Sequence, residues 1–327
     1  MFEIGSFLEL DLPKGREYHT GLGVARLNSG RGGIFHASEI LCCDTVWLPL
    51  YQCDTVRDFL TKQGKNVKYY KIDENFDPVG IVQKPDEAVV IVNYYGVMSH
   101  ERMASLAGKY DNVIIDDSQA FFCEPVPDCM NVYSARKFVG VPDGCYVVGQ
   151  GAEALCGEYP QDYSSDTSLF LLKRIEYGCE KTYADRTVNE ERFDNCGVRR
   201  MSKLTHALLD AADYEYIAGK RRENFRIAHE LFGGMNKIDP MKYYDDTCVP
   251  MVYPFVAESD TLLGEMQKNK IFQGHWWSYL LDEVDPESFE YWLSRYIIPI
   301  TIDQRYGREE IEFCRDIAAE HLRRSAQ

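Results

Sequence analysis

Residues 87–119 read EAVVIVNYYGVMSHERMASLAGKYDNVIIDDSQ, which is an apolar run, a polar segment with helical spacing and a second apolar run. The continuous Val/Ile character of 87–95 is typical of a strand buried on both faces, as in a parallel sheet. We expect a helix at 101–110 and the next buried strand at 112–116. This strand–helix–strand unit predicts a doubly wound α/β sheet with right-handed crossovers.

The same alternation continues on both sides of this unit. Residues 45–50 and 67–72 have strand character and enclose a helical pattern at 53–63. Beyond the unit, an apolar run before Ser134 and another after the turn at 142–144 are expected to add two strands. The sequence therefore predicts a large, mainly parallel α/β domain with its ligands at the carboxyl ends of the strands.

Three further segments complete the expected large domain. Residues 1–18 are expected to form an N-terminal arm, and the polar stretch 177–195, which has no sustained period, an excursion over the surface. Helical spacing over 201–229 indicates two helices that are broken near Asp213 or Gly219. The basic run Lys220-Arg221-Arg222 is expected on a solvated face of the second helix.

A smaller domain is expected after Gly233-Gly234, so that the large domain covers 1–232 and the small one 233–327. The small domain alternates expected strands with expected helices, which favours an α/β cap of antiparallel character. The strands are expected at 249–256 and 297–302, and the helices at 259–268 and 311–321.

Composition excludes several classes of protein. The 327 residues include 36 Lys and Arg against 52 Asp and Glu, and the net charge of −16 argues against a nucleic-acid or anionic membrane partner. The most apolar run, 88–98, is too short to span a bilayer, and no N-terminal signal pattern is seen. The 11 cysteines and seven histidines form no C-x-x-C or H-E-x-x-H pattern, so we expect a cytoplasmic protein with no metal.

Lys137 is the first candidate for chemistry, because it lies at the end of an expected strand, three residues after Ser134. Partial burial and a cationic neighbour such as Arg136 both lower the pKa of a lysine, which is what a Schiff-base lysine needs. An ordinary solvated turn lysine fits the same local pattern. The motif alone therefore leaves both interpretations open.

Two other strand-end elements favour the chemical interpretation. The turn at 28–33 opens a helix expected at 34–41, and its free N–H groups suit a phosphate, although Ser29 or Asn28 as a simple helix cap is the alternative. Asp116 ends a buried strand and suits either a buried cation, for instance a protonated pyridine nitrogen, or a metal ion. On a strand, Asp117 is expected to point the opposite way.

These motifs occur in an order that resembles the DegT/DnrJ/StrS-type aminotransferases, which are fold-type-I enzymes that use pyridoxal 5'-phosphate. The resemblance covers nearly the whole chain. Its motifs are SGR at 29–31, LPLY at 48–51, VNYYG at 92–96, IIDDSQA at 114–120, YSARKFVGVPDGC at 133–145, RMS at 200–202 and PITIDQRY at 299–306.

The resemblance implies a role for each matching residue. Lys137 would form the aldimine with pyridoxal 5'-phosphate, and Asp116 would pair with its ring nitrogen. Gln119 would lie near the phenolic oxygen, and Tyr51 would stack on the ring. The phosphate would be held by Ser134 and by the turn at Ser29, Gly30 and Arg31.

The sequence also departs from the family pattern. Ser134 stands where many members have histidine or phenylalanine, and the usual stacking aromatic residue is replaced near Cys53. The Gly-Tyr-Asn-Tyr-Arg motif lacks its asparagine, which reaches the partner's cofactor in the family, and Val198 and Arg199 stand in its place. Arg199 is compatible with a phosphate contact or with a surface ion pair.

The leading hypothesis is a homodimeric aminotransferase that moves an amino group from glutamate or glutamine to a keto-sugar, which is expected to be nucleotide-linked. The retained Asp116 and Lys137 favour catalysis over the dehydratase branch of the family, in which the lysine is replaced. A relative that binds pyridoxal phosphate or a sugar nucleotide in a regulatory or scaffolding role is the alternative. A metal-dependent transferase that uses Asp116 and Asp117 is a third hypothesis.

Overall fold

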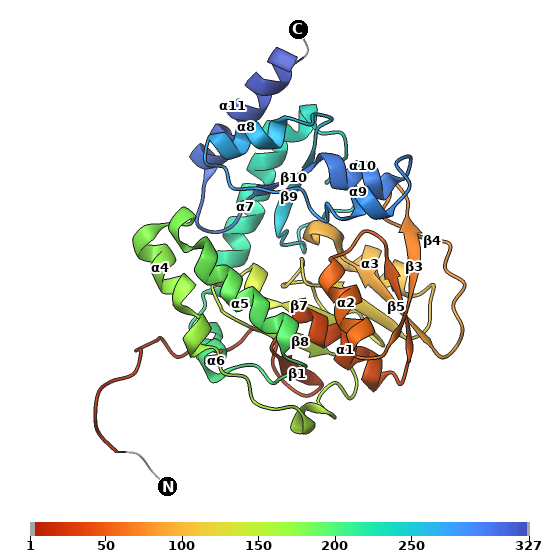
Figure 1. Ribbon diagram of the computed structural model, residues 1–327, viewed down its shortest axis with the longest axis vertical. Helices are drawn as coiled ribbons and strands as arrows, with labels where there is room; N and C mark the ends of the chain where they lie inside the picture. The colour runs from red at the N-terminus through yellow and green to blue at the C-terminus, as the bar shows by residue number, and fades with distance from the viewer. Residues whose placement is uncertain (1–3, 326–327) are drawn as a thin grey trace.

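The computed structural model describes residues 4–325 as a large sheet with helices on both faces and a smaller C-terminal unit (Figure 1). The strands of the large sheet are β1 (Val24–Leu27), β2 (Thr45–Pro49), β3 (Asn66–Ile72), β4 (Pro78–Val79), β5 (Glu87–Val92), β6 (Val113–Asp117), β7 (Met130–Ser134) and β8 (Cys145–Val148). Their order is β1-β8-β7-β6-β5-β2-β3-β4.

The five central strands, β7, β6, β5, β2 and β3, are parallel, whereas β1, β8 and β4 are antiparallel to their neighbours. All six residues of β5 are buried, as its apolar run predicts. Helices α1 (Gly30–Ile40), α2 (Asp54–Lys62) and α3 (His100–Ala107) connect the strands. The predicted fold-type-I α/β architecture is confirmed.

Close packing places α1 directly on the sheet. A Cβ atom on Gly33 would lie 2.6 Å from the Cys145 sulfur and 2.9 Å from a Val132 methyl group. Only glycine therefore allows the helix to approach β7 and β8 this closely. The same approach fixes where the N-terminus of α1 lies.

The opposite face of β7 and β8 has its own apolar cluster, which includes Phe121, Tyr133, Tyr146 and Leu209. Helix α6 (Lys203–Asp210) and the start of α7 (Tyr214–Phe232) cover this face. The break between the two helices at Asp213 is confirmed, because the Asp213 side chain caps α7 by accepting the Tyr216 N–H.

The C-terminal unit has the expected antiparallel character. Its strands β9 (Val252–Val256) and β10 (Ile297–Thr301) pair antiparallel. Its helices are α8 (Leu262–Lys268), α9 (Leu280–Glu283), α10 (Phe289–Tyr296) and α11 (Arg308–Ser325). Helix α7 packs against both β9 and α11, and a 3₁₀ turn at Gly233–Met235 ends it, at the proposed boundary between 232 and 233.

Three expectations are wrong. Strand β1 was not expected, because its four residues, which follow a glycine-rich turn, are too few to show a strand pattern in the sequence. The stretch 177–195 contains a regular helix, α5 (Tyr183–Asn195), which lies beside α4 (Leu169–Tyr177). Arg221 is 2% exposed rather than solvated, since backbone carbonyl groups and the Gln304 side chain satisfy its guanidinium.

Candidate active site

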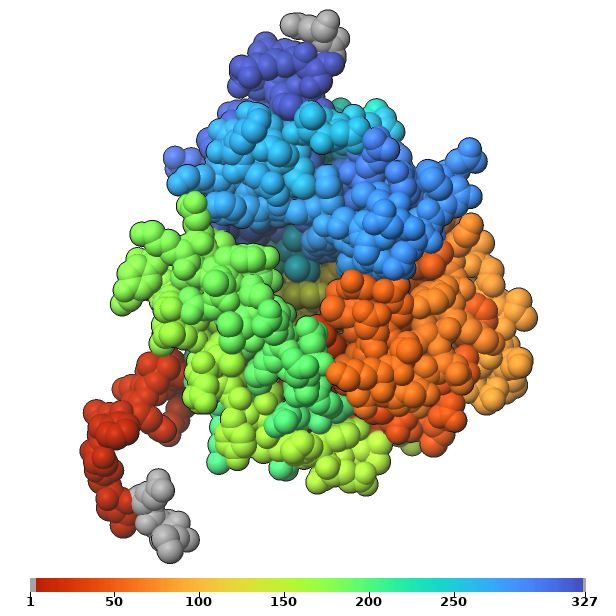
Figure 2. Space-filling model, viewed as in Figure 1, coloured from red at the N-terminus to blue at the C-terminus, as the bar shows by residue number. Residues whose placement is uncertain are grey.

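The turn before α1, the end of β6 and the turn before β8 meet at one edge of the sheet. A Cβ atom on Gly30 would lie 3.2 Å from the Ser118 hydroxyl, and the Gly144 N–H donates to the Asn28 carbonyl at 3.0 Å. Figure 2 shows a hollow where the C-terminal unit, the region around α5 and the α2 region come together. The structure thus brings the turn at 28–33 close to the end of β6 and to the turn before β8.

The N-terminus of α1 is capped, but only in part. The Ser29 hydroxyl accepts the Gly32 N–H at 3.3 Å, and the Ser29 carbonyl accepts the Gly33 N–H at 2.9 Å. Within residues 4–325, the N–H groups of Gly30 and Arg31 have no hydrogen-bond acceptor. Ser29 is therefore a helix cap, as in the simpler interpretation, and two N–H groups are still free to bind an anion.

Asp116 is buried at the end of β6, and each carboxylate oxygen accepts one hydrogen bond. Oδ2 accepts from the Gln52 amide at 2.9 Å, and Oδ1 accepts from the Ser118 N–H at 3.0 Å. The Gln52 Oε1 atom is buried and has no donor among the described residues. Sequence reasoning missed Gln52, although its position directly after Tyr51 at the end of β2 is a usable signal.

Lys137 ends the 3₁₀ turn that follows β7, and its side chain keeps contact with solvent. Its ammonium group makes no hydrogen bond or ion pair with residues 4–325. The surrounding protein lowers the pKa of Lys137 by restricting hydration, Asp116 raises this pKa, and the neighbouring Arg136 lowers it. A lowered pKa increases the share of neutral amine, which is the nucleophilic form.

Gln119 follows the end of β6, and Ser134 is the last residue of β7. The side-chain Oε1 of Gln119 accepts the Tyr95 N–H at 2.7 Å, which leaves the side-chain NH₂ group of Gln119 free to donate. Ser134 is buried, and its hydroxyl makes no hydrogen bond to another residue of the described chain. Both side chains thus keep a donor that is free for a ligand.

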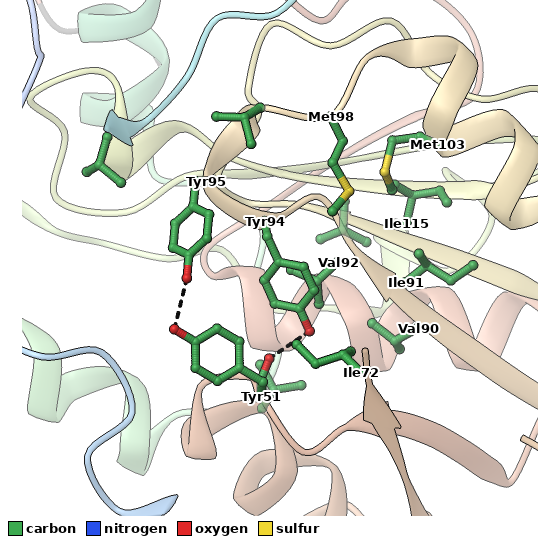
Figure 3. Packing of buried hydrophobic residues seen from close by; sticks show 14 of the residues in the cluster. Tyr51, Ile72, Val90, Ile91, Val92, Tyr94, Tyr95, Met98, Met103 and Ile115 are labelled. Atoms are coloured by element: carbon green, nitrogen blue, oxygen red, sulfur yellow. Dashed lines mark hydrogen bonds between the residues drawn. The ribbon is translucent and has the colours of Figure 1, made fainter. Parts of the chain in front are cut away.

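Tyr51 does not lie as expected. It is fully buried, and its hydroxyl is 2.9 Å from the Tyr95 hydroxyl (Figure 3). Its ring meets the edge of Trp277 at 4.4 Å between centroids, and Trp276 stacks on Tyr95 at 5.4 Å. The small C-terminal unit therefore covers this tyrosine pair, and the structure leaves no face of Tyr51 open for stacking on a ligand.

Asp117 lies on the opposite face of the sheet from Asp116, as expected. Its carboxylate accepts a hydrogen bond from Asn93 at 3.1 Å, and burial raises its pKa well above the usual range. The two neighbouring carboxylates thus do not face one common site. Among residues 4–325, no group of three or more His, Cys, Asp or Glu side chains is arranged to hold a metal ion.

Arg199 contributes its backbone to the site rather than its charge. Its carbonyl accepts the Asn28 N–H at 2.9 Å, and its own N–H donates to the Asn28 side chain at 3.3 Å. These bonds hold the turn before α1. In the part of the chain that the structure describes, the Arg199 guanidinium has no ion pair.

Solved structures share this fold at low sequence identity, whereas no protein-family model and no curated protein sequence matches the chain. DesV from S. venezuelae, solved with a ketimine intermediate, is 16% identical with a TM-score of 0.61, over 91% of this chain and 84% of that one. The sugar aminotransferase CalS13 from Micromonospora echinospora is 12% identical with a TM-score of 0.64, over 90% and 86%. The chain has the fold of these enzymes.

A third similar structure comes from a protein with another reaction. It is the GDP-4-keto-6-deoxy-D-mannose-3-dehydratase of E. coli with bound hydrated PLP, 14% identical with a TM-score of 0.62, over 90% of this chain and 87% of that one. Sugar aminotransferases and a dehydratase therefore share this fold. The fold by itself does not choose between their reactions. No helix within residues 4–325 is both long and apolar enough to cross a membrane.

Proposed function

We propose that this protein is a pyridoxal-phosphate-dependent aminotransferase. The observation that carries the proposal is the meeting of an unpaired Lys137, the buried Asp116 and the free N–H groups of α1 at one sheet edge. The fold is that of sugar aminotransferases, which supports the same conclusion.

The groups present fit this cofactor at three points. The N–H groups of Gly30 and Arg31, with the Ser134 hydroxyl, would hold its phosphate. Asp116 would face the ring nitrogen, and the free amide of Gln119 would donate to the phenolic oxygen. Tyr51 does not fit the stacking role, because its ring is covered.

The chain's own groups suit amino transfer. Bound pyridoxal phosphate supplies an aldehyde for an amine and a ring that accepts electrons from the substrate carbon. The carboxylate of Asp116 would favour the protonated ring nitrogen through its negative charge. Lys137, with its lowered pKa, would accept and return the proton of the substrate carbon.

The finer assignments rest on what the similar structures are. A nucleotide-linked keto-sugar is proposed as acceptor, with glutamate or glutamine as donor, because the similar structures include sugar aminotransferases. A homodimer is proposed as well, since α4 exposes Leu169, Leu172 and Ile175 along one side. The cytoplasm is the proposed compartment, where all 11 free cysteines stay reduced.

The first test is the visible absorbance of lysine-bound pyridoxal phosphate. Wild-type protein is expected to develop this band and Lys137→Ala to lack it, because Lys137 is the lysine whose ammonium group senses the charge of Asp116. The variant Lys181→Ala, which removes an exposed lysine, is the matched control and is expected to keep the band. A band that persists in Lys137→Ala would disprove the assignment of the lysine.

The second test separates catalysis from passive binding. Glutamate is expected to convert the band to that of the pyridoxamine form, and Asp116→Asn to slow this conversion by roughly 100-fold or more, because the ring loses its anionic partner. Stopped-flow absorbance measures both rates. Cofactor binding without conversion by any amino donor would favour the regulatory or scaffolding alternative.

A further inference from the structure

A basic cavity lies between α4, α5 and the loop that follows Lys137. Its volume is about 330 Å³, and its lining includes four arginines, Arg136, Arg174, Arg186 and Arg305. Glu190 is the one carboxylate among its lining residues. For a chain with a net charge of −16, this local excess of positive charge is unusual.

A second, larger cavity of about 620 Å³ shares part of its lining with the basic cavity. Arg136, Arg174 and Arg305 line both cavities, and the larger one adds Lys137 and Arg221. Asp303 is the only acidic residue in its lining. The two cavities together therefore place six cationic side chains against two carboxylates.

Acidic partners neutralise only some of these arginines. Arg136 pairs with Glu190, and Arg305 forms a two-pronged ion pair with Asp303 at 2.8 and 2.6 Å. Arg174 and Arg186 make no ion pair or side-chain hydrogen bond with residues 4–325. The Arg136 Nε atom is buried and also has no acceptor within that range.

The arginines are close enough to repel one another. Burial lowers the pKa of Arg136, Glu190 raises it, and the positive charges of Arg186 and Arg31 lower it further. Guanidinium groups with unused donors, gathered around a cavity, suit the oxygens of a phosphate group. An anion in this cavity would supply the acceptors and the negative charge that the chain does not.

We propose that Arg136, Arg174, Arg186 and Arg305 form a binding site for a multiply charged, phosphate-bearing anion. The lining of this cavity does not include the residues at the N-terminus of α1, whose backbone N–H groups are proposed to face the cofactor phosphate. Two aromatic rings line the same cavity, Tyr183 and Phe272, which are 66% and 53% exposed. They offer an apolar surface to the uncharged part of such a ligand.

The test is isothermal titration calorimetry with inorganic pyrophosphate, using protein already saturated with pyridoxal phosphate. We expect wild-type protein to bind pyrophosphate, and Arg174→Gln/Arg186→Gln to bind it at least tenfold more weakly. The control Arg226→Gln/Arg315→Gln removes the same charge from two arginines outside the cavity and is expected to bind as the wild type does. Circular dichroism confirms that both variants are folded.

Further titrations test which class of anion the site binds and whether the site exists. Citrate has a similar charge without phosphate oxygens, so equally strong citrate binding would overturn the phosphate assignment. Equal loss of affinity in both double variants, or no binding of pyrophosphate to wild-type protein, would overturn the site itself. The visible band of bound pyridoxal phosphate separates this proposal from the proposed function, because pyrophosphate binding by wild-type protein that never develops this band would contradict only the latter.

Discussion

A buried arginine, Arg221, donates hydrogen bonds to the backbone of the loop that contains Lys137. Arg221 Nη2 donates to the Lys137 carbonyl at 3.2 Å, and Nη1 donates to the Met251 carbonyl at 2.8 Å. Its Nε donates to Gln304, whose amide in turn donates to the Phe138 carbonyl at 2.9 Å. The loop, α7 and the β9 region therefore share one hydrogen-bonded side chain.

Replacing this side chain, as in Arg221→Met, is expected to lower the free energy of unfolding by about 2–4 kcal/mol. The reason is that at least two buried carbonyl groups lose their donor, at about 1–3 kcal/mol each. Urea denaturation measures the loss. The control Arg226→Gln removes an exposed arginine of the same helix and is expected to cost less than about 1 kcal/mol. Equal losses in both variants would contradict the role of Arg221.

A single buried histidine, His19, is expected to make the stability of the protein depend on pH. His19 stacks on Tyr133 at 4.1 Å, and its Nε2 lies 2.9 Å from the Phe121 carbonyl, so the neutral ring donates there. Burial lowers the pKa of His19 to about 4. Because the unfolded chain protonates near pH 6.5, the stability from the neutral ring is present above this pH and is lost as pH falls towards 4.

The loss from His19 is expected to reach about 3 kcal/mol between pH 7 and pH 4, following the size of the pKa shift. Urea denaturation at several pH values measures it. His19→Phe cannot titrate and is expected to show a flatter curve. Parallel curves for the two proteins would show that the acid sensitivity comes from other groups, such as Glu17, whose pKa is lowered by its contacts with His206, Tyr146 and Arg26.

At the scale of secondary-structure elements, α1 is placed by its glycines. Gly33→Ala is expected to destabilise the protein by about 1–3 kcal/mol, because the added methyl group would overlap Cys145 and Val132. Gly219→Ala in α7 is the matched control, since nothing lies within 4 Å of its added atom, and a gain of about 0.5–1 kcal/mol is expected. Thermal unfolding compares them, and the same sign for both changes would contradict the packing argument.

Helices α4 and α5 have apolar side chains on the outside of the molecule. Leu172 and Ile175 are 58% and 84% exposed, one turn apart on α4. A monomer rarely leaves such a row in water, so the row supports contact with a second copy of the chain. Helices α4 and α5 also line the basic cavity, so the anion-site proposal, unlike the dimer, depends on the stretch 177–195 that we expected to be irregular.

For the whole molecule, we expect a dimer whose interface includes α4. Light scattering after size-exclusion chromatography is expected to give twice the chain mass for wild-type protein and the chain mass for Leu172→Glu/Ile175→Glu. Val79→Glu/Val82→Glu adds the same charge at exposed valines of the sheet edge and is expected to leave the dimer intact. A monomeric wild-type protein, or dimers for both variants, would contradict this interface.

The sequence was sufficient for the central strands of the sheet and for the candidate residues at its edge. Apolar runs such as 87–92 are buried on both faces, and this requirement appears directly in the choice of Val and Ile. Ser29, Asp116 and Lys137 follow strands or turns that local sequence identifies. Residue types and their spacing along the chain therefore determined the fold class and where to look for chemistry.

Contacts between segments far apart in the sequence decided the rest. Gln52 bonds to Asp116, Trp277 covers Tyr51, and Arg221 reaches the Lys137 carbonyl, each across more than 60 residues. The spacing of residue types along the sequence does not predict such a contact, because the burial of a polar or aromatic side chain depends on which distant segments pack against it. The sequence determined which groups could react, and only the tertiary structure decided which of them are free to do so.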